Sequence, residues 1–124
     1  SWLIFARLLA LRLLLAEPAL AGTGALREAF SEHGAKAFGF EPPPEMAGLL
    51  CRPRVGDPQR WAGVLLAATR ATELGDEYDD DWFRNPRAIE QLRAEARQPP
   101  ATTCTTEALT SGAAALKQLL VAQL

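Results

Sequence analysis

The sequence is poor in several residue types, and each shortage narrows the possible classes of protein. It contains a single histidine, His33, and two cysteines, Cys51 and Cys104, which have no CxxC or Cys/His spacing. Without clustered histidine and cysteine ligands, we expect no metal site in this chain. Isoleucine and valine are scarce, whereas alanine, leucine and arginine dominate. Because β-branched residues favour strands and the dominant residues favour helices, the composition predicts an all-α fold.

No charge of one sign predominates either, since the chain has 13 basic and 15 acidic residues and a net charge of −2. Nucleic-acid-binding proteins carry a basic surface, so we expect no nucleic-acid partner. The length of 124 residues predicts a single helical domain over residues 1–124, or the C-terminal segment of a larger domain. We expect an all-α, mostly antiparallel bundle of about six helices.

The cysteine usage and the preference for arginine over lysine suggest a bacterial, cytoplasmic protein. In a reducing cytoplasm we favour two free, half-buried thiols. A disulfide between Cys51 and Cys104 is the alternative.

The clearest helical pattern begins at Asp57. Asp57 and Pro58 form a helix start, because a carboxylate caps free N–H groups and proline fits the first helical position. Gly75 predicts the end of this helix, although the polar run after it allows one further turn. The residues at helical spacing on its apolar face are Trp61, Val64, Leu65, Ala68 and Thr72.

A second helix follows, because Asn85 and Pro86 repeat the start signal. Its apolar residues at helical spacing are Ile89, Leu92 and Ala96. Arg87 and Glu90 are spaced i, i+3, for which we expect a weak ion pair. The two helices together predict a helical hairpin joined by an acidic, aromatic corner.

The acidic corner, residues 76–82, is the strongest candidate site in the sequence. Its acidic residues are Asp76, Glu77, Asp79, Asp80 and Asp81. Paired carboxylates can bind Ca²⁺ or Mg²⁺ or share a proton, but this run lacks the spaced ligands and turn glycine of an EF-hand. We therefore expect a solvated corner, in which Asp80 or Asp81 caps the short turn at Trp82.

The aromatic and basic residues beside the corner have structural roles in this prediction. Trp82 and Phe83 fill the junction between the two helices, and Arg84 and Arg87 pair with the neighbouring acids. If the corner recognises a partner or substrate, the expected contacts are Asp80, Asp81, Trp82, Arg84 and Arg87.

The segment YDDDWFRNPRA, residues 78–88, carries a family resemblance. With a Trp-bearing helix before it and another helix after it, it resembles the C-terminal region of thimet-oligopeptidase-like (gluzincin) zinc metallopeptidases from bacteria. The segment TTEALTSGAAALKQLL is similar to the short helix, glycine and final helix that close such chains. The resemblance covers the last half of the sequence, and the first half only in its helical pattern.

The chain departs from that family at the zinc site. Those enzymes need an HExxH helix, in which two histidines bind zinc and the glutamate activates water. His33 is the sole histidine, so no such helix exists in this chain and no catalytic residue carries over. The resemblance implies a non-catalytic part of a metallopeptidase, with zinc only in the intact enzyme and no cofactor in this chain.

Residues 2–16 are the most hydrophobic stretch, and we predict a buried helix there. Only Arg7 and Arg12 interrupt apolar residues that occupy nearly every angle of the helix, so it needs neighbours on most sides. The remainder of a parent polypeptide, or a second copy meeting it through residues 2–15, would supply them. A signal peptide and a membrane-surface helix are the alternatives that we favour less, because the arginines lie inside the run. The run also falls short of the roughly 20 apolar residues of a membrane span.

A further helix is predicted from Thr23, which would cap it, to Gly39, which would end it. Its apolar side comprises Leu26, Ala29, Phe30, Ala37 and Phe38. His33 lies on or beside this side, where a lone histidine is usually a hydrogen-bonded core residue. It is a weak acid–base candidate, because the sequence does not visibly place carboxylate or thiol companions near it for that chemistry.

Prolines separate the remaining segments. Residues 41–44 predict a rigid connector, and residues 44–51 predict a short helix. For Arg52-Pro53-Arg54 we predict a solvated loop, and an anion-binding site is the less favoured alternative. Residues 98–100 end the second hairpin helix. The possible caps for a last helix near Glu107 are Thr102, Thr103, Thr105 and Thr106.

Gly112 would split this last region and leave a final segment over residues 113–124. The expected buried side of that segment comprises Leu116, Leu119 and Leu120.

These patterns support three functional hypotheses. The leading one is a non-catalytic C-terminal helical part of a bacterial metallopeptidase-like protein, which supports a substrate cleft built mainly from upstream residues. The alternative is a stand-alone helical interaction module that self-associates through its N-terminal apolar helix. A small enzyme using His33 with an acidic neighbour is the third and weakest.

Overall fold

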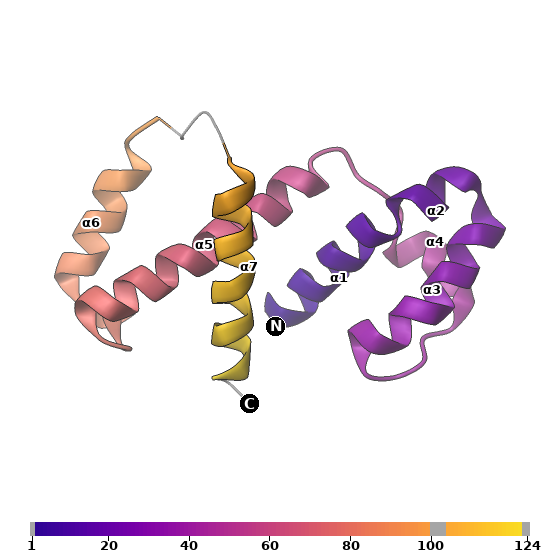
Figure 1. The fold of residues 1–124 in the computed structure, drawn as a ribbon, viewed down its shortest axis with the longest axis horizontal. Helices are drawn as coiled ribbons and strands as arrows, with labels where there is room; N and C mark the ends of the chain where they lie inside the picture. Colours follow the sequence, from indigo (N-terminus) through magenta and orange to yellow (C-terminus); the bar gives the residue numbers. More distant parts are fainter. Residues whose placement is uncertain (1, 100–103, 123–124) are drawn as a thin grey trace. The chain divides into compact units, whose positions relative to one another are not determined.

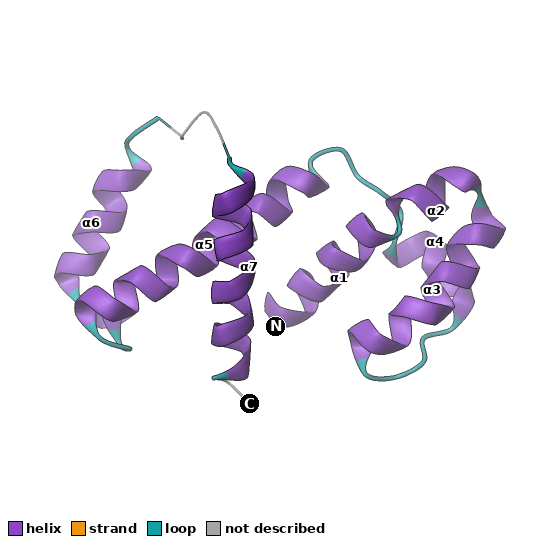
Figure 2. Ribbon diagram, in the orientation of Figure 1, coloured by secondary structure: helices purple, strands orange, loops and turns teal. Residues whose placement is uncertain are grey.

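The computed structural model describes residues 2–99 and 104–122, and within these ranges the chain is helical and has no strand (Figures 1 and 2). The predicted all-α fold of about six helices is confirmed by seven α-helices in the described ranges. These are α1 (Trp2–Leu14), α2 (Ala16–Ala21), α3 (Thr23–Phe38), α4 (Ala47–Leu50), α5 (Asp57–Tyr78), α6 (Pro86–Ala96) and α7 (Thr106–Val121). Two short 3-10 helices, η1 (Pro44–Met46) and η2 (Trp82–Arg84), complete the elements.

The chain divides into two compact units, Ser1–Trp61 and Ala62–Leu124. In the first unit α3 is the central element and contacts α1, α2, η1 and α4. The buried side chains that pack together there are Leu11, Leu15, Leu26, Phe30, Ala47 and Cys51. Ala29, Ala37 and Phe38 pack against this cluster, so the predicted apolar side of the helix is confirmed.

Helix α1 is buried over only part of its surface. Ala6 and Leu9 are buried, as the sequence predicted for the whole helix. In contrast, Ile4, Phe5 and Leu14 are 59%, 49% and 58% exposed. We predicted a helix with neighbours on most sides. In the structure, large apolar side chains of α1 are instead exposed to solvent.

The two ends of α3 differ in how well they were predicted. Gly22, and not Thr23, occupies the N-cap position, and no side-chain hydrogen bond caps this end. Thr23 is already helical because the chain turns from α2 into α3 at Gly22, whose φ is 131°. At the other end Gly39 has a φ of 78° and its N–H donates to the Ala35 carbonyl oxygen, which confirms the predicted stop.

The proline-rich connector is part of the core of this unit. Pro42 is fully buried and packs on α3 at Gly34, where an added Cβ would lie 2.9 Å from the Pro42 Cγ. After it, η1 and α4 form the short helix predicted over residues 44–51.

Both cysteines have free thiols, as we predicted, but neither is half-buried. Cys51 is fully buried and Cys104 is exposed. Burial raises the pKa of the Cys51 thiol to about 11, and the positive charge of Arg12 opposes this rise only in part. The Cys51 thiol is thus both inaccessible and protonated at neutral pH.

We expect the two thiols to react with a thiol-labelling reagent at very different rates. At pH 8 a pKa of about 11 leaves roughly one Cys51 thiol in a thousand ionised, and the thiolate is the reacting form. In a Cys104→Ser variant, labelling should be slow and should accelerate with urea. In a Cys51→Ser variant, labelling should match that of an unstructured peptide. Fast labelling of Cys51 in native buffer would show that this core is open.

In the second unit, α5 and α6 form the predicted hairpin. The Tyr78 hydroxyl donates to Gln91 Oε1 at 2.6 Å, and Arg70 donates from two nitrogens to the Glu95 carboxylate at 3.1 and 2.5 Å. Residues later in α5 therefore meet residues earlier in α6, which is an antiparallel arrangement. Helix α5 runs three residues past Gly75, within the further turn that the sequence allowed.

Helix α7 is continuous, so the predicted split at Gly112 is wrong. Gly112 is buried where α7 crosses α5 (Figure 1), and an added Cβ would lie 2.5 Å from the carbonyl oxygen of Leu65. The glycine therefore permits close approach of two helices and does not end one.

The start of α7 was predicted closely. The Thr105 hydroxyl accepts the Ala108 N–H at 3.2 Å, so this threonine is the cap. Leu116 is buried, while Leu119 and Leu120 are only half-buried. The other proposed caps, Thr102 and Thr103, and the predicted end of the helix at residue 124 lie outside the described residues.

Candidate functional site

The backbone of the acidic corner is a defined turn. After α5 ends at Tyr78, Asp79 adopts a φ of 67°, and its carbonyl oxygen accepts the Trp82 N–H at 3.0 Å. Helix η2 follows, and the Asn85 side chain then accepts the Arg87 N–H at 3.0 Å to cap α6. The Asn-Pro start signal is confirmed, and the corner is held by local hydrogen bonds.

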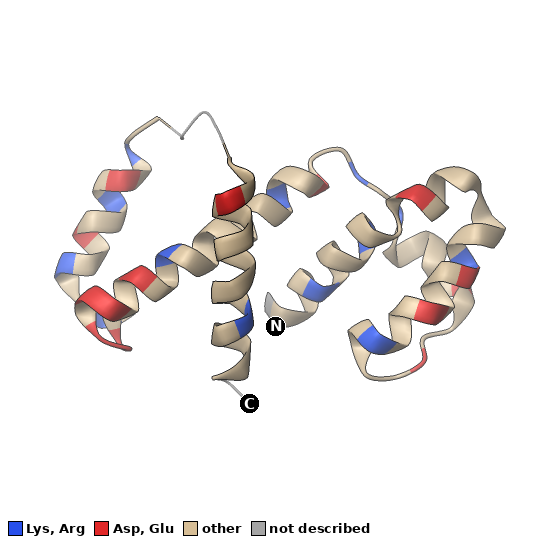
Figure 3. Ribbon diagram, in the orientation of Figure 1, with Lys and Arg blue, Asp and Glu red and all other residues tan. Residues whose placement is uncertain are grey.

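The acidic side chains of the corner are exposed, as predicted for a solvated corner, and gather around the end of α5 (Figure 3). The predicted cap at Trp82 is not formed. Asp81 stands at the N-cap position of η2 without a side-chain hydrogen bond, and the Asp79 carbonyl oxygen accepts the Trp82 N–H instead. Among the described residues, neither Asp80 nor Asp81 has an ion-pair partner.

The two aromatic residues of the corner differ in burial. Trp82 is half-buried, which agrees with a role at the junction of the helices. Phe83 is 56% exposed, so the prediction that it fills the junction is wrong. The 3-10 turn explains the difference, because adjacent residues of η2 point in different directions and only one ring can face inward.

The basic residues of the corner do not pair with acids in the described part of the chain. The Arg84 guanidinium lies 5.5 Å from the centre of the Phe83 ring, and Arg87 forms neither the predicted pair with Glu90 nor one with the corner acids. The ion pairs of this unit instead involve Arg70, which contacts Glu73 at 2.9 Å and Glu95. These acids raise the pKa of Arg70 further, with Glu73 as the larger cause.

A shallow hollow of about 280 Å³ lies beside the corner. It is lined by Asp76, Asp80 and Trp82 from the corner and by Gln118 and Leu119 from α7, together with Ala122 and with other residues of α5. Sequence reasoning placed the first three residues at the corner, but it could not bring α7 beside them. The hollow has an acidic rim and a partly apolar wall.

His33 lies in a groove between α1 and α3. Its side chain is 31% exposed, and its Nε2 atom is 3.9 Å from Glu32 Oε2. The groove has a volume of about 340 Å³ and is lined by Arg7, Ala10, Leu11, Leu14, His33, Lys36 and Ala37. Arg7 and Lys36 are the charged groups in this lining, and Glu32, which lies outside the lining, is the acidic neighbour of His33.

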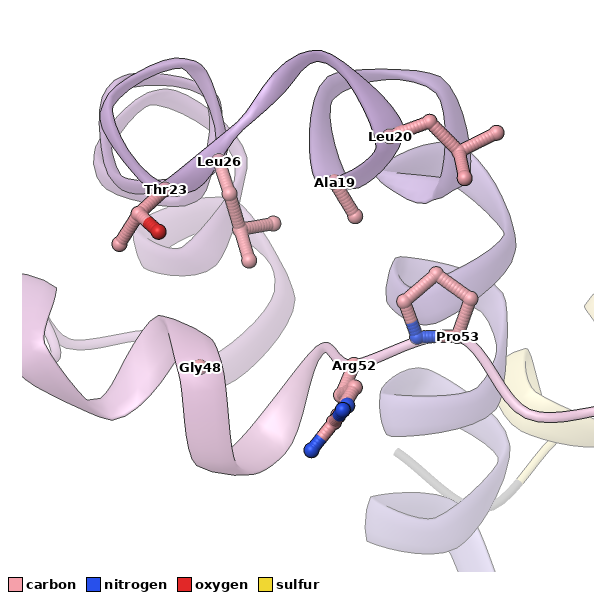
Figure 4. A pocket seen from close by; sticks show the side chains of 7 residues that line it. All are labelled: Ala19, Leu20, Thr23, Leu26, Gly48, Arg52 and Pro53. Atoms are coloured by element: carbon pink, nitrogen blue, oxygen red, sulfur yellow. The ribbon is translucent and has the colours of Figure 1, made fainter.

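A second groove in the first unit lies between α2, α3 and α4 and has a volume of about 510 Å³ (Figure 4). Its lining comprises Ala19, Leu20, Thr23, Leu26, Gly48, Arg52 and Pro53. Figure 4 shows Thr23 and Leu26 pointing toward α4, whereas the Arg52 side chain points away from them. The guanidinium of Arg52 therefore does not point into the groove. This orientation does not support the alternative hypothesis that the loop binds an anion.

A buried ion pair was missed by sequence reasoning. Arg12 Nη2 donates to Asp57 Oδ1 at 3.0 Å, and the two side chains are 6% and 3% exposed. Asp57 Oδ2 also accepts the Arg54 N–H at 3.1 Å. In the described residues the hydrogen bonds of this carboxylate go to these groups and not to N–H groups of α5, so its predicted capping role is wrong. The available signal was an arginine inside an otherwise apolar run.

Two kinds of feature are absent from the described residues, a metal-binding group and a membrane-crossing helix. No group of three or more His, Cys, Asp or Glu residues in them is arranged to hold a metal ion. No described helix combines the length and the apolar character needed to cross a membrane.

Comparison with known proteins adds no relative, because no family model, curated protein or solved structure matches the chain.

Proposed function

We propose that this chain is a non-catalytic helical interaction module that self-associates through α1. The observation that carries this proposal is the exposure of Ile4, Phe5 and Leu14 on a helix that also contributes buried side chains to the core. Ile4 and Phe5 are neighbours near the start of α1, and large exposed apolar side chains that lie close together are typical of an interaction surface. Two copies that cover these side chains remove them from water and gain about 25 cal/mol for each Å² of apolar surface.

A matched pair of double variants tests this function. Ile4→Ser with Phe5→Ser removes apolar surface from α1, whereas Leu20→Ser with Leu49→Ser removes exposed apolar surface elsewhere, at 87% and 75% exposure. We expect the α1 variant to weaken self-association by about tenfold or more, on the scale of two buried apolar side chains. The control should associate like the unmodified chain. Equal association of both variants in light scattering after size exclusion would contradict the proposal.

The corner favours a second candidate, a C-terminal support region of a bacterial, cytoplasmic metallopeptidase-like protein. The segment of residues 78–88 forms a locally fixed turn, with Asn85 capping α6 and Phe83 and Arg84 facing outward. Such a turn can brace a substrate cleft formed by other polypeptide. That polypeptide would cover α1 and supply the zinc ligands.

The reading frame upstream of Ser1 tests this second candidate. The second candidate predicts an upstream helix with the HExxH pattern. A chain that joins that helix to this sequence should bind one zinc ion. An extended frame without the pattern would remove the peptidase hypothesis and leave the interaction module untouched.

A further inference from the structure

The groove between α1 and α3 combines an apolar floor with positive charge. Leu11, Leu14 and the two alanines form the floor, and Leu14 is 58% exposed there. Arg7 and Lys36 are exposed residues of the lining, one from each helix. In the described residues neither has an ion-pair partner. An occupant that matches this groove presents an apolar side chain flanked by negative charge.

The acidic corner of the same chain has this chemistry. It carries exposed carboxylates at Asp79, Asp80 and Asp81. Phe83, two residues after Asp81, is 56% exposed, and the Arg84 guanidinium lies 5.5 Å from the centre of its ring. The local hydrogen bonds of the turn hold the acids and the ring together, so little conformational freedom is lost when they bind. Opposite charges on the two surfaces also favour this pairing over like-charged surfaces.

We propose that the α1–α3 groove of one copy binds the acidic corner of a second copy, with Phe83 on the apolar floor and the aspartates near Arg7 and Lys36. This inference rests on the self-association proposed above and adds a contact that is distinct from the one made by Ile4 and Phe5, which do not line the groove. Because the surfaces differ, the contact is head-to-tail, and repeated contacts generate rings or open chains.

Charge reversal tests the pairing directly. The groove variant carries Arg7→Glu and Lys36→Glu, and the corner variant carries Asp80→Lys and Asp81→Lys. Each variant alone should self-associate about tenfold or more weakly, because like charges then face each other in the contact. Mixing the two variants should restore association, since each groove then meets a corner of opposite charge.

A control variant matches the groove variant in net charge. Arg27→Glu with Arg93→Glu reverses two exposed arginines that line neither surface and should associate like the unmodified chain. Sedimentation equilibrium gives the association constants, and circular dichroism confirms that each variant is folded.

The outcomes separate this inference from the proposed function. Weak association of each reversed variant with recovery on mixing supports the groove–corner contact. If the unmodified chain associates but neither reversal weakens it, self-association stands and this contact is overturned. If only the groove variant is weakened, the groove has a different acidic occupant and the inference is likewise overturned. If the unmodified chain does not associate, both proposals fail.

Discussion

Replacing Arg12 with methionine is expected to destabilise the first unit by about 3 kcal/mol. The substitution leaves the Asp57 carboxylate buried without its guanidinium partner at 3.0 Å. The Arg54 N–H remains, and Arg60 lies 3.7 Å from the carboxylate but is itself 55% exposed. We therefore place the loss at the lower end of the range for breaking a buried pair. Urea-dependent labelling of Cys51 in a Cys104→Ser background measures the opening free energy.

A double variant separates the buried charge from lost packing. Arg12→Met combined with Asp57→Asn removes both charges and should recover most of the lost stability. The Nε atom of Arg12 is buried and has no hydrogen-bond partner among the described residues. Burial of this unpaired donor costs free energy in the native protein, and the double variant removes that cost. Equal losses in the single and double variants would show that the ion pair is not the cause.

Replacing Gly112 with alanine is expected to destabilise the second unit by about 3 kcal/mol. The new Cβ would lie 2.5 Å from the carbonyl oxygen of Leu65, 2.7 Å from its carbonyl carbon and 2.8 Å from its Cβ. The first two are backbone atoms, so no side-chain rotation relieves the contact and the helices must separate. Thermal unfolding followed by circular dichroism measures the loss.

Gly63 in α5 provides the matched control for this substitution. It is also a helical glycine, but an added Cβ would meet no atom within 4 Å. Gly63→Ala should therefore stabilise the protein by about 0.5–1 kcal/mol, through helix propensity alone. If both alanine variants were stabilised, the helices would not approach as closely as the structure shows.

The local start and stop signals were the most predictable features. Asn85 before Pro86, Thr105 before the last helix and Gly39 after α3 all occupy the predicted kind of position. These signals depend on a few neighbouring residues, so the sequence contains them in full. Thr23 failed as a cap because the conformation of Gly22 moved the helix start by one residue.

Contacts between distant residues were not predictable. In the sequence Gly112 is a potential helix breaker, and only the fold shows that it packs against Leu65. Arg12 likewise interrupts an apolar run, and only the fold shows that it pairs with Asp57. At the candidate site, the solvated acids were foreseen, because a dense run of like charges stays in water. The exposure of Phe83 was not predicted, because the direction of a side chain in a 3-10 turn depends on the whole hairpin.

The central claim is that the exposed apolar side chains of α1 are a surface for self-association. Sedimentation equilibrium of the unmodified chain over a wide concentration range tests it most directly. The account predicts a molar mass that rises with concentration above that of one chain. A molar mass that stays at one chain up to millimolar concentration would contradict it.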